Sequence, residues 1–455
     1  MKIESINPRT GKSIETFEEI KTDELSEIII KSKKAQKSWA RLPSEERIKV
    51  ILKLSEIIDR EKEQIAEIVF EEAGFLRTET LGEITGDILI GIESHIMDYN
   101  AVKELDFSNE TFESKVQFMP QGVIGHIGIW NYPVWQTFIT AIPALLVGNA
   151  IIYKLSEFTT MTGLKIAEMI WESGVPKDVF IPVSGGSTIG QEIVKSDVDM
   201  IVFTGGSGTG NKIIKEAGTK PLLLELSGND AGIICEDCDL KQTIKGVIWG
   251  SFLHGGQVCT RIKRVFVERD ISEKFLDGFL EQTKRLKIGE QIAPLIRAEA
   301  REKVDDQVQE SIKGGAKLLL GGNKSSREGF YFEPTILLYE DSNATMYEDE
   351  IFGPVALVQI VENVDEAIKK SNDTKYGLGA TIWTRDQKKA MFIAEKLDVG
   401  MVWINDSNAA IPGGVYYGGI KESGIASSQK RVMSFMKKKM IISNSKAEIR
   451  DWWYS

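Results

Sequence analysis

The sequence has few residues of the two kinds that build metal centres and disulfide frameworks. Only three cysteines and three histidines occur among its 455 residues. Three cysteines are too few for a disulfide framework in a chain of this length, so we expect a reducing compartment and a cytoplasmic protein. His95, His126 and His254 lack the spacing of metal ligands, and we therefore expect no metal site.

An excess of basic charge and long apolar runs are also missing. Acidic residues outnumber basic ones by 67 to 56, which argues against nucleic acid as a main partner because phosphate binding needs a basic surface. The most apolar stretch, 134–153, is interrupted by Gln136, Pro143, Gly148 and Asn149, and this indicates a buried helix followed by a buried strand. The N-terminus shows no apolar leader, so we expect neither a membrane partner nor an export signal.

The patterns along the chain predict an α/β protein with more than one domain, since 455 residues exceed the size of a single core. Residues 22–104 have helical periodicity, with Thr22 and Ser44 as candidate N-caps. The expected strands are 111–119, 123–129, 150–154, 179–183, 200–205, 221–226 and 440–442, with helices at 133–147 and 160–173 and a second strand–helix series from 231 to about 403. Apolar strands alternating with helices indicate parallel sheets covered on both faces.

Cys259 lies in the stretch GGQVCT, residues 255–260, among small residues at the end of an apolar run. Glycines let a backbone approach a ligand closely, and free backbone N–H groups can lower the pKa of a thiol and make it a nucleophile. A buried, inert cysteine beside a turn is the alternative interpretation.

Two polar residues follow expected strands. Glu225 lies at the carboxyl end of 221–226, the edge where parallel sheets bind ligands, and partial desolvation there would raise its pKa toward that of a general base. It could equally be a salt-bridge partner at a domain seam. Asn131 lies between a strand and the helix opened by Pro133, so its amide can donate to an oxyanion or cap that helix.

Three further segments carry weaker signals. The Gly-rich turn 203–210 opens a helix, whose free N–H groups attract phosphate. In 153–157, Glu157 could accept from ribose hydroxyls and would repel a 2′-phosphate, whereas Lys154 could accommodate one. The pair Cys235 and Cys238 could be a redox pair, but no thioredoxin-like context surrounds it.

Seven motifs occur in a fixed order between residues 5 and 445. They are WNYP (130–133), YKLSE (153–157), FTGGSGTG (203–210), LELSGN (224–229), GGQVCT (255–260), EIFGPV (350–355) and YYGGIKESG (416–424). Together they resemble the NAD(P)-dependent aldehyde dehydrogenase superfamily, of the non-acylating, hydrolytic type. The chain departs from the usual motifs at Gly206, where Ser is common, at Ser227, where Gly is usual, and in YYGG, which replaces PFGG.

The resemblance implies oxidation of a small aldehyde to a carboxylic acid, with NAD as the expected cofactor and NADP as the alternative. Cys259 would attack the aldehyde, the Asn131 amide and the Cys259 backbone N–H would hold the oxyanion, and Glu225 would activate the water that hydrolyses the thioester. The implied cofactor-binding residues are Ile129, Trp130, Lys154, Glu157, Gly186, Gly190, Phe203, Thr204, Gly205, Gly206, Ser207, Thr209, Leu226, Glu350 and Phe352.

The resemblance also implies the α/β aldehyde-dehydrogenase architecture. A Rossmann-like cofactor domain would take residues 1–104 and 121–227, and an α/β catalytic domain would take 228–430. Segments 105–120 and 431–447 would form a small β arm, followed by a tail at 448–455. An arm that adds to a partner's sheet predicts a homodimer or homotetramer.

Four alternatives stay open. Succinate-semialdehyde specificity is suggested by Trp135-Gln136 and by YGLGATIWT (376–384). A CoA-acylating semialdehyde dehydrogenase is disfavoured because Glu225 is present. A family member that has lost its activity and serves as a structural or binding protein is disfavoured, because Cys259, Glu225, Asn131 and Glu350 are present together. A cysteine hydrolase would need His254 as its base.

Overall fold

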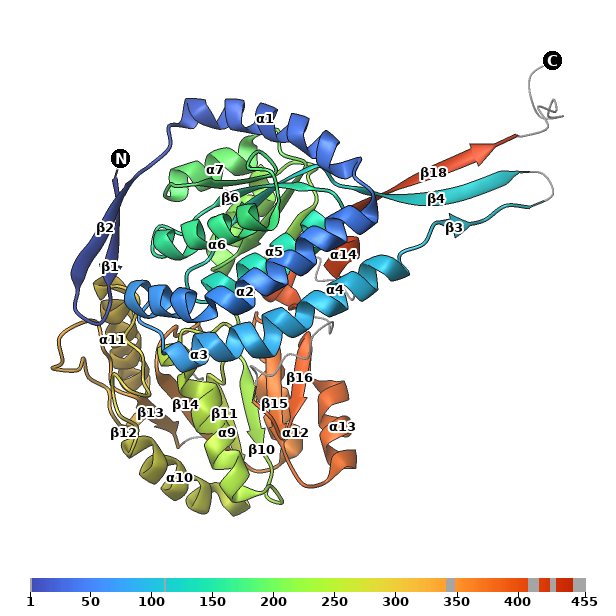
Figure 1. The fold of residues 1–455 in the computed structure, drawn as a ribbon. Coiled ribbons are helices and arrows are strands. Elements are labelled where there is room, and N and C mark those ends of the chain that lie inside the picture. The colour runs from blue at the N-terminus through green and yellow to red at the C-terminus, as the bar shows by residue number, and fades with distance from the viewer. Residues whose placement is uncertain (1, 110–111, 341–347, 408–416, 426–430, 445–455) are drawn as a thin grey trace.

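The structure, a computed structural model, describes residues 2–109, 112–340, 348–407, 417–425 and 431–444. Its elements form two α/β lobes, one above the other in Figure 1, and a narrow arm that projects from the upper lobe. A hairpin of β1 (Lys2–Asn7) and β2 (Lys12–Glu18), which the sequence patterns did not predict, lies along one side of the molecule.

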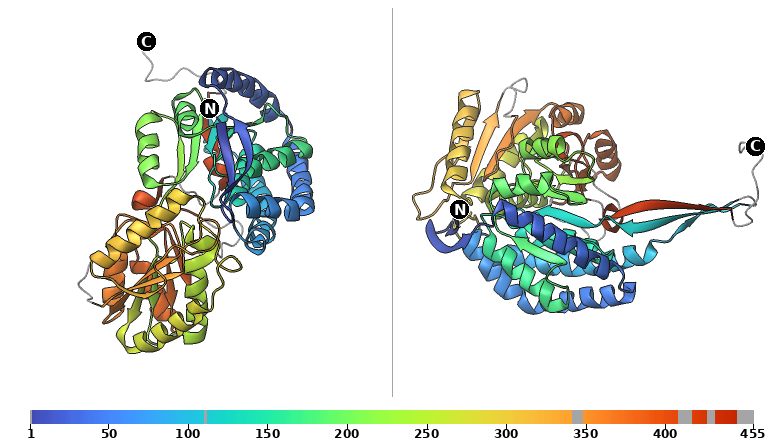
Figure 2. Two further views of the ribbon diagram at one scale, coloured as in Figure 1. Left: turned by 90° about the vertical axis from the view of Figure 1, so that its left-hand side faces the viewer. Right: turned by 90° about the horizontal axis from the view of Figure 1, so that it is seen from above.

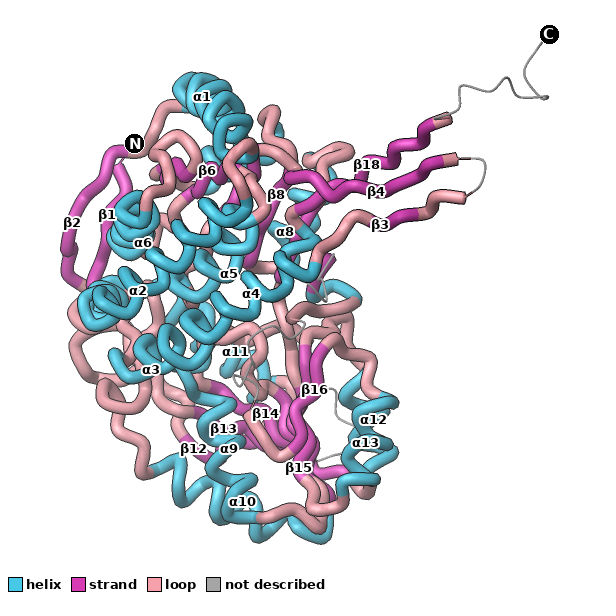
Figure 3. Tube along the Cα trace, turned by 45° about the vertical axis from the view of Figure 1, so that its right-hand side comes forward, coloured by secondary structure: helices cyan, strands magenta, loops and turns pink. Residues whose placement is uncertain are grey.

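The first lobe is built on a six-stranded sheet with the order β17-β9-β8-β5-β6-β7. Its parallel strands are β5 (Val123–Ile127), β6 (Ala150–Lys154), β7 (Phe180–Val183), β8 (Met200–Thr204) and β9 (Leu222–Glu225). Every residue of β5 and β6 is buried, because helices cover the sheet on both faces (Figure 3). The predicted parallel sheet is confirmed.

The helices of this lobe include α1 (Thr22–Ala40), α2 (Ser44–Glu72), α5 (Pro133–Leu146), α6 (Thr160–Ser173), α7 (Ser187–Lys195) and α8 (Ser207–Glu216). Thr22 and Ser44 begin α1 and α2, whose N-caps are instead Lys21 and Pro43. The capping role predicted for these two side chains is therefore wrong, because a cap must stand one residue before the first helical residue.

A helical run of unusual geometry connects α2 to the arm. It consists of α3 (Arg77–Gly82), the π-helix η1 (Glu83–Ile88) and α4 (Leu89–Ala101). At the end of η1 the N–H of Leu89 donates to the carbonyl of Ile84, five residues back. Short π-helical segments inside α-helices often occur at functional sites.

The second lobe contains a seven-stranded sheet with the order β12-β13-β14-β11-β10-β15-β16, in which only the edge strand β12 is antiparallel. Its strands are β10 (Ala231–Ile234), β11 (Arg264–Glu268), β12 (Lys317–Leu320), β13 (Thr335–Tyr339), β14 (Val355–Val361), β15 (Gly379–Trp383) and β16 (Met401–Ile404). Its helices are α9 (Leu240–Phe252), α10 (Arg269–Lys284), α11 (Ala298–Lys313), α12 (Val364–Asn372) and α13 (Gln387–Lys396). Ile233 and Ile234 enter separate apolar clusters, one on each face of the sheet.

The arm is a three-stranded antiparallel sheet that extends far beyond the lobes (Figure 2). It consists of β3 (Leu105–Asp106), β4 (Glu113–Pro120) and β18 (Met436–Ser443), preceded by the short helix α14 (Arg431–Ser434). The strands expected at 111–119 and 440–442 are therefore present, although the first part of the former and the expected tail 448–455 lie outside the described residues.

One late segment returns to the first lobe. After η3 (Lys421–Ser423), the strand β17 (Gly424–Ile425) pairs antiparallel with β9, so that Gly424 lies opposite Glu225. These residues fall in the segment 228–430 expected for the catalytic domain, yet their sheet is that of the first lobe. The chain therefore crosses between the lobes again before the arm is completed.

Candidate active site

The loop that carries Cys259 joins α9 to β11 through the short helix η2 (Leu253–Gly256). His254, Gly255 and Gly256 have φ values of 51°, 63° and 75°, three successive residues in the left-handed region. A Cβ on Gly256 would lie 2.0 Å from the carbonyl oxygen of Gly353, so this position needs glycine for space as well as for backbone angle. The turn brings Cys259 to the seam between the lobes.

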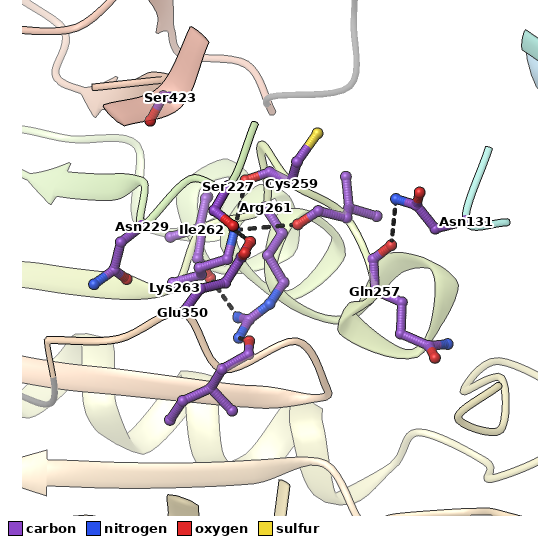
Figure 4. A network of polar contacts seen from close by, with 12 residues as sticks. Asn131, Ser227, Asn229, Gln257, Cys259, Arg261, Ile262, Lys263, Glu350 and Ser423 are labelled. Atoms are coloured by element: carbon purple, nitrogen blue, oxygen red, sulfur yellow. Dashed lines mark hydrogen bonds and ion pairs between the residues drawn. The ribbon is translucent and has the colours of Figure 1, made fainter. Parts of the chain in front are cut away.

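Buried side chains fix this loop from both sides (Figure 4). Nδ2 of Asn131 donates to the carbonyl of Gln257 at 2.9 Å. The Gln257 amide in turn donates to the carbonyls of His254 and Pro294 at 2.9 and 3.0 Å and accepts from the N–H of Ile296 at 2.9 Å. Asn131 does not cap α5, whose N-cap is Tyr132 and lacks a side-chain cap bond. The capping alternative for Asn131 is therefore excluded.

A buried ion pair lies under the backbone of the cysteine. Nζ of Lys263 is 3.2 Å from Oε1 of Glu350 and donates to the carbonyl oxygens of Val258 and Cys259 at 3.1 and 2.5 Å. Figure 4 shows the Cys259 sulfur pointing away from this pair. Glu350, expected to contact the cofactor, thus also helps to hold the loop that carries Cys259.

The Cys259 residue is half-buried, and its thiol lies 3.3 Å from the hydroxyl of Tyr417. Burial raises the pKa of Cys259 to about 11, although the Tyr417 hydroxyl and the Lys263 ammonium both act to lower it. We expected neighbouring N–H groups to lower the pKa of the Cys259 thiol, but in the protein without bound ligands this pKa is raised. Burial of the thiol outweighs them.

Two cavities meet at this thiol. One, of about 600 Å³, and the other, of about 800 Å³, share four lining residues: Ile129, Asn131, Thr204 and Cys259. Both volumes are typical of small-molecule sites. A ligand in either cavity would therefore reach the same sulfur atom.

The larger cavity brings together many of the residues expected to bind the cofactor. Those that line it are Ile129, Trp130, Thr204, Gly205, Gly206, Ser207, Leu226, Glu350 and Phe352. The ring of Trp130 stands edge-on to that of Phe352 at 5.6 Å. Phe203, Thr209, Lys154, Glu157, Gly186 and Gly190 do not line it.

The residues of the larger cavity fit a dinucleotide. The N-terminus of α8 opens into it, and no atom lies within 4 Å of where a Cβ would stand on Gly206 or Gly208. A phosphate can therefore approach free backbone N–H groups closely. The nearby aromatic pair of Trp130 and Phe352 offers an apolar wall for a ring.

The remaining expected cofactor residues lie at the carboxyl ends of β6 and β7. Nζ of Lys154 is 2.6 Å from Oε2 of Glu157, and Lys154 lies opposite Val183. Close to that strand end, the N–H of Gly186 donates to Oε1 of Glu19 at 2.7 Å. Glu19, which sequence reasoning missed, thus adds a second carboxylate to this edge.

Glu225 is mostly buried at the end of β9. It lines neither cavity, but its charge and that of Cys259 both raise the pKa of Tyr417, after the larger effect of burial. Glu225 lies opposite Thr204 on the neighbouring strand β8, and Thr204 lines both cavities. The structure thus gathers Glu225, Asn131 and Cys259 at one edge of the first sheet.

His254 does not act on the thiol. Its ring is stacked between those of Phe75 and Tyr132, at 4.2 and 4.5 Å, and its Nδ1 lies 3.2 Å from the carbonyl oxygen of Asn131. Burial lowers the pKa of His254 to about 4, so the ring is neutral at pH 7. The geometry gives no support to the cysteine-hydrolase alternative.

Cys235 and Cys238 are free and buried, and burial raises the pKa of both thiols. A redox pair needs reactive thiolates, so these two are packing residues. Among the described residues, no group of three or more His, Cys, Asp and Glu is arranged to hold a metal ion. Within the same residues, every helix is too short or too polar to cross a membrane.

A half-buried thiol between a cavity that fits a dinucleotide and a second cavity is the arrangement of a nicotinamide-dependent oxidoreductase. Comparison with known proteins agrees. The family model described as "Aldehyde dehydrogenase family" matches residues 1–441. The chain belongs to this family and oxidises aldehydes with NAD or NADP.

Relatives cover almost the whole chain. Betaine aldehyde dehydrogenase of Bacillus subtilis is 34% identical over 476 residues, covering 99% of this chain and 96% of its own. The 4-trimethylaminobutyraldehyde dehydrogenase of Sus scrofa is 34% identical over 449 residues, covering 94% and 90%. A Staphylococcus aureus betaine aldehyde dehydrogenase structure with NAD+ has a TM-score of 0.95, 28% identity and coverage of 100% and 95%.

A Methanocaldococcus jannaschii glyceraldehyde-3-phosphate dehydrogenase structure with NADP has a TM-score of 0.91 at 29% identity, covering 97% of this chain and 99% of its own. Solved relatives thus contain either cofactor.

Proposed function

We propose that Cys259 is the nucleophile of this aldehyde oxidation, assisted by Asn131 and Glu225. The observation that carries the assignment is the position of the thiol where the two cavities meet. An aldehyde in the smaller cavity would reach the sulfur on one side, and the ring of a dinucleotide in the larger cavity would lie on the other. Hydride transfer needs this arrangement of reacting groups.

The thiolate adds to the aldehyde carbon and forms a C–S bond, which leaves the carbonyl oxygen as an oxyanion. The second N–H of the Asn131 amide and the backbone N–H of Cys259 stabilise that charge, the first N–H being fixed on Gln257. The nicotinamide cofactor, when bound, accepts the hydride, and a thioester remains on Cys259.

Water then attacks the thioester and releases the acid and the free thiol. Glu225, opposite Thr204 at the end of β9, accepts a proton from this water. The presence of Glu225 also disfavours the CoA-acylating alternative. In that reaction a CoA thiol attacks the thioester in place of water, and no base is needed to activate a water molecule. The intact set of Cys259, Asn131 and Glu225 disfavours the alternative of a family member that has lost its activity.

We propose NAD as the preferred cofactor. The carboxylates of Glu157 and Glu19 both lie at the ends of β6 and β7, where an acidic residue accepts from a ribose 2′-hydroxyl and repels a 2′-phosphate. Lys154 forms an ion pair with Glu157, with Nζ 2.6 Å from Oε2. Its charge is therefore already balanced, which makes it a weaker partner for a 2′-phosphate and supports the preference for NAD.

We propose a cytoplasmic homo-oligomer. The three free cysteines support a reducing compartment. Met440 and Ile442 of the arm are 66% and 55% exposed, so pairing with a second copy would cover apolar surface and a free sheet edge. The cofactor domain would comprise 1–104 and 121–227, the catalytic domain 228–430 without β17, and the arm 105–120 and 431–447, with 448–455 as a tail.

The test is reduction of NAD and NADP, followed by NADH absorbance, with purified protein and a panel of aldehydes. We expect acid as the product without added CoA, and loss of turnover in Cys259→Ala. Glu225→Gln should retain one rapid turnover of hydride transfer and lose the steady state, because only deacylation needs the base. Full turnover in Cys259→Ala, or a strict need for CoA, would contradict the assignment.

A further inference from the structure

The smaller cavity beside Cys259 has an unusually acidic lining. Four carboxylates line it: Glu79, Glu83, Asp87 and Asp406. Among the described residues that line it there is no Lys or Arg, and its one histidine, His254, has a pKa lowered to about 4 by burial. The cavity in which the aldehyde must sit is therefore lined by acids, with no basic side chain among the described lining residues.

The helical run α3–η1 brings three of these carboxylates together. Glu79, Glu83 and Asp87 are four residues apart, a spacing that places side chains on one face of a helix. Two backbone N–H groups from other residues that line the cavity, those of His254 and Trp135, hold that face in place. The N–H of His254 donates to Glu79 at 3.3 Å, and the N–H of Trp135 donates to Glu83 at 2.5 Å.

Aromatic rings form much of the remaining wall. Tyr132, Trp135, Trp249 and Tyr417 line the cavity. The Trp135 ring stands edge-on to Tyr417 at 5.2 Å and to Tyr132 at 6.2 Å, and Tyr417 reaches the Cys259 sulfur. Rings placed in this way attract a cation through their negative faces, most strongly where water is excluded.

We propose that the aldehyde oxidised here carries a positive charge, an ammonium group a few bonds from the carbonyl that lies among these carboxylates and rings. The inference rests on the proposed function of Cys259. The aldehyde carbon would lie at the sulfur, and the ammonium group would point toward Glu83 and Asp87.

The burial of these acids supports the proposal. Burial raises the pKa of Glu83 to about 8, with the charges of Asp87 and Glu79 adding to the effect, and it raises the pKa of Glu79 to about 7 despite backbone hydrogen bonds and the charge of Arg9. Proteins retain such perturbed acids mainly at functional sites. A cation bound among these acids would favour their ionised forms and would itself be bound more tightly. A metal ion is a poor candidate, since no group of ligands in the described part of the chain is arranged for one.

The same acidic lining argues against succinate semialdehyde. Its carboxylate would enter a cavity with four acidic side chains and, among the described residues, no basic partner. Like charges at such a site oppose binding.

The experiment compares kcat/KM for three aldehydes that differ mainly in charge. Trimethylammonioacetaldehyde is the cation, 3,3-dimethylbutanal is its neutral isostere, and succinate semialdehyde is an anion. We expect the cation to exceed the neutral isostere at least tenfold and the anion by more. Oxidation of the neutral isostere at an equal or higher kcat/KM would overturn the charge inference and leave the proposed function intact.

Two isosteric variants locate the charge. Glu83→Gln and Asp87→Asn should each lower the cation-to-neutral ratio at least threefold with little change for the neutral aldehyde. Glu93→Gln, at an exposed position of α4 in the same helical run, is the control and should leave the ratio unchanged. An unchanged ratio in both cavity variants would contradict the placement.

A binding measurement decides the inference even without turnover. Calorimetry would compare choline with 3,3-dimethyl-1-butanol, a cation and its neutral isostere. Tighter binding of choline by at least tenfold, reduced in Glu83→Gln, supports the proposal. Equal binding overturns it. Absence of oxidation of all three aldehydes, together with selective choline binding, would instead refute the proposed function while supporting a cation site.

Discussion

Tyr417 should control how readily Cys259 ionises. The Tyr417 hydroxyl lies 3.3 Å from the sulfur and acts to lower the thiol pKa, which burial raises to about 11. Tyr417→Phe removes this donor and keeps the ring that packs on Trp135. The variant should therefore raise the Cys259 pKa without opening the cavity.

The size of the effect follows from the charge on the acceptor. A hydrogen bond to a charged group contributes about 1.5–3 kcal/mol, which corresponds to about one to two pKa units at about 1.36 kcal/mol per unit. The thiolate fraction below pH 10 would fall by about 10- to 100-fold. A more basic thiolate is also more nucleophilic, with a Brønsted coefficient of about 0.4–0.5, so alkylation should slow by only about 3- to 16-fold.

The assay is the rate of iodoacetamide alkylation of Cys259 between pH 7 and 10, followed by mass spectrometry. The rate should rise with pH in wild type, because the thiolate is the reacting form and the pKa lies above this range. Tyr153→Phe, which removes a buried hydroxyl bonded to Thr137, is the control. An unchanged or faster rate in Tyr417→Phe, with Tyr153→Phe like wild type, would refute the reasoning.

Four further predictions concern cofactor choice and stability. Glu157→Gln combined with Glu19→Gln should raise the NADP-to-NAD ratio of kcat/KM about tenfold; an unchanged ratio would remove the basis for the NAD preference. Lys263→Met should lower the unfolding free energy by about 3–5 kcal/mol in urea titrations, because Glu350 would stay buried without its cation, and adding Glu350→Gln should restore part of the loss. Gly256→Ala, at φ 75° and against the Gly353 carbonyl, should lose at least about 1–2 kcal/mol for the backbone alone, whereas Gly91→Ala in α4, with no atom within 4 Å, should gain about 0.5–1 kcal/mol. The unfolding free energy should fall as pH rises from about 4.5 to about 8, because unfolded Glu83 ionises near 4.5 while the folded side chain stays protonated until about 8; Glu83→Gln should flatten this fall, and an identical slope in the variant would contradict it.

The parts of the site that could be predicted from sequence are those encoded within a few neighbouring residues. Cys259, Asn131 and Glu225 each lie at the end of a strand or in a turn whose local pattern is plain, and the family resemblance of their motifs predicts that they meet in one site. The glycines before Cys259 are predictable for the same reason, since their left-handed backbone is a local property.

The parts that could not be predicted depend on contacts between distant segments. Helical periodicity places Glu79, Glu83 and Asp87 on one face, but only the fold brings Glu83 to the N–H of Trp135, 52 residues later. Glu19 meets Gly186 across 167 residues. The Tyr417 hydroxyl that acts to lower the pKa of Cys259 likewise comes from a segment 158 positions away.

The late return of the chain to the first lobe affects how the protein can be synthesised. β4, at residues 113–120, pairs with β18, at 436–443. β9, at residues 222–225, pairs with β17, at 424–425, so both strands are synthesised well before their partners. A ribosome delivers these partners about 200 and 320 residues later, and the nascent first lobe therefore exposes two unpaired strand edges during that part of translation. Removal of β18 would leave β4 paired with β3 alone, so completion of the arm depends on a segment made long after β4.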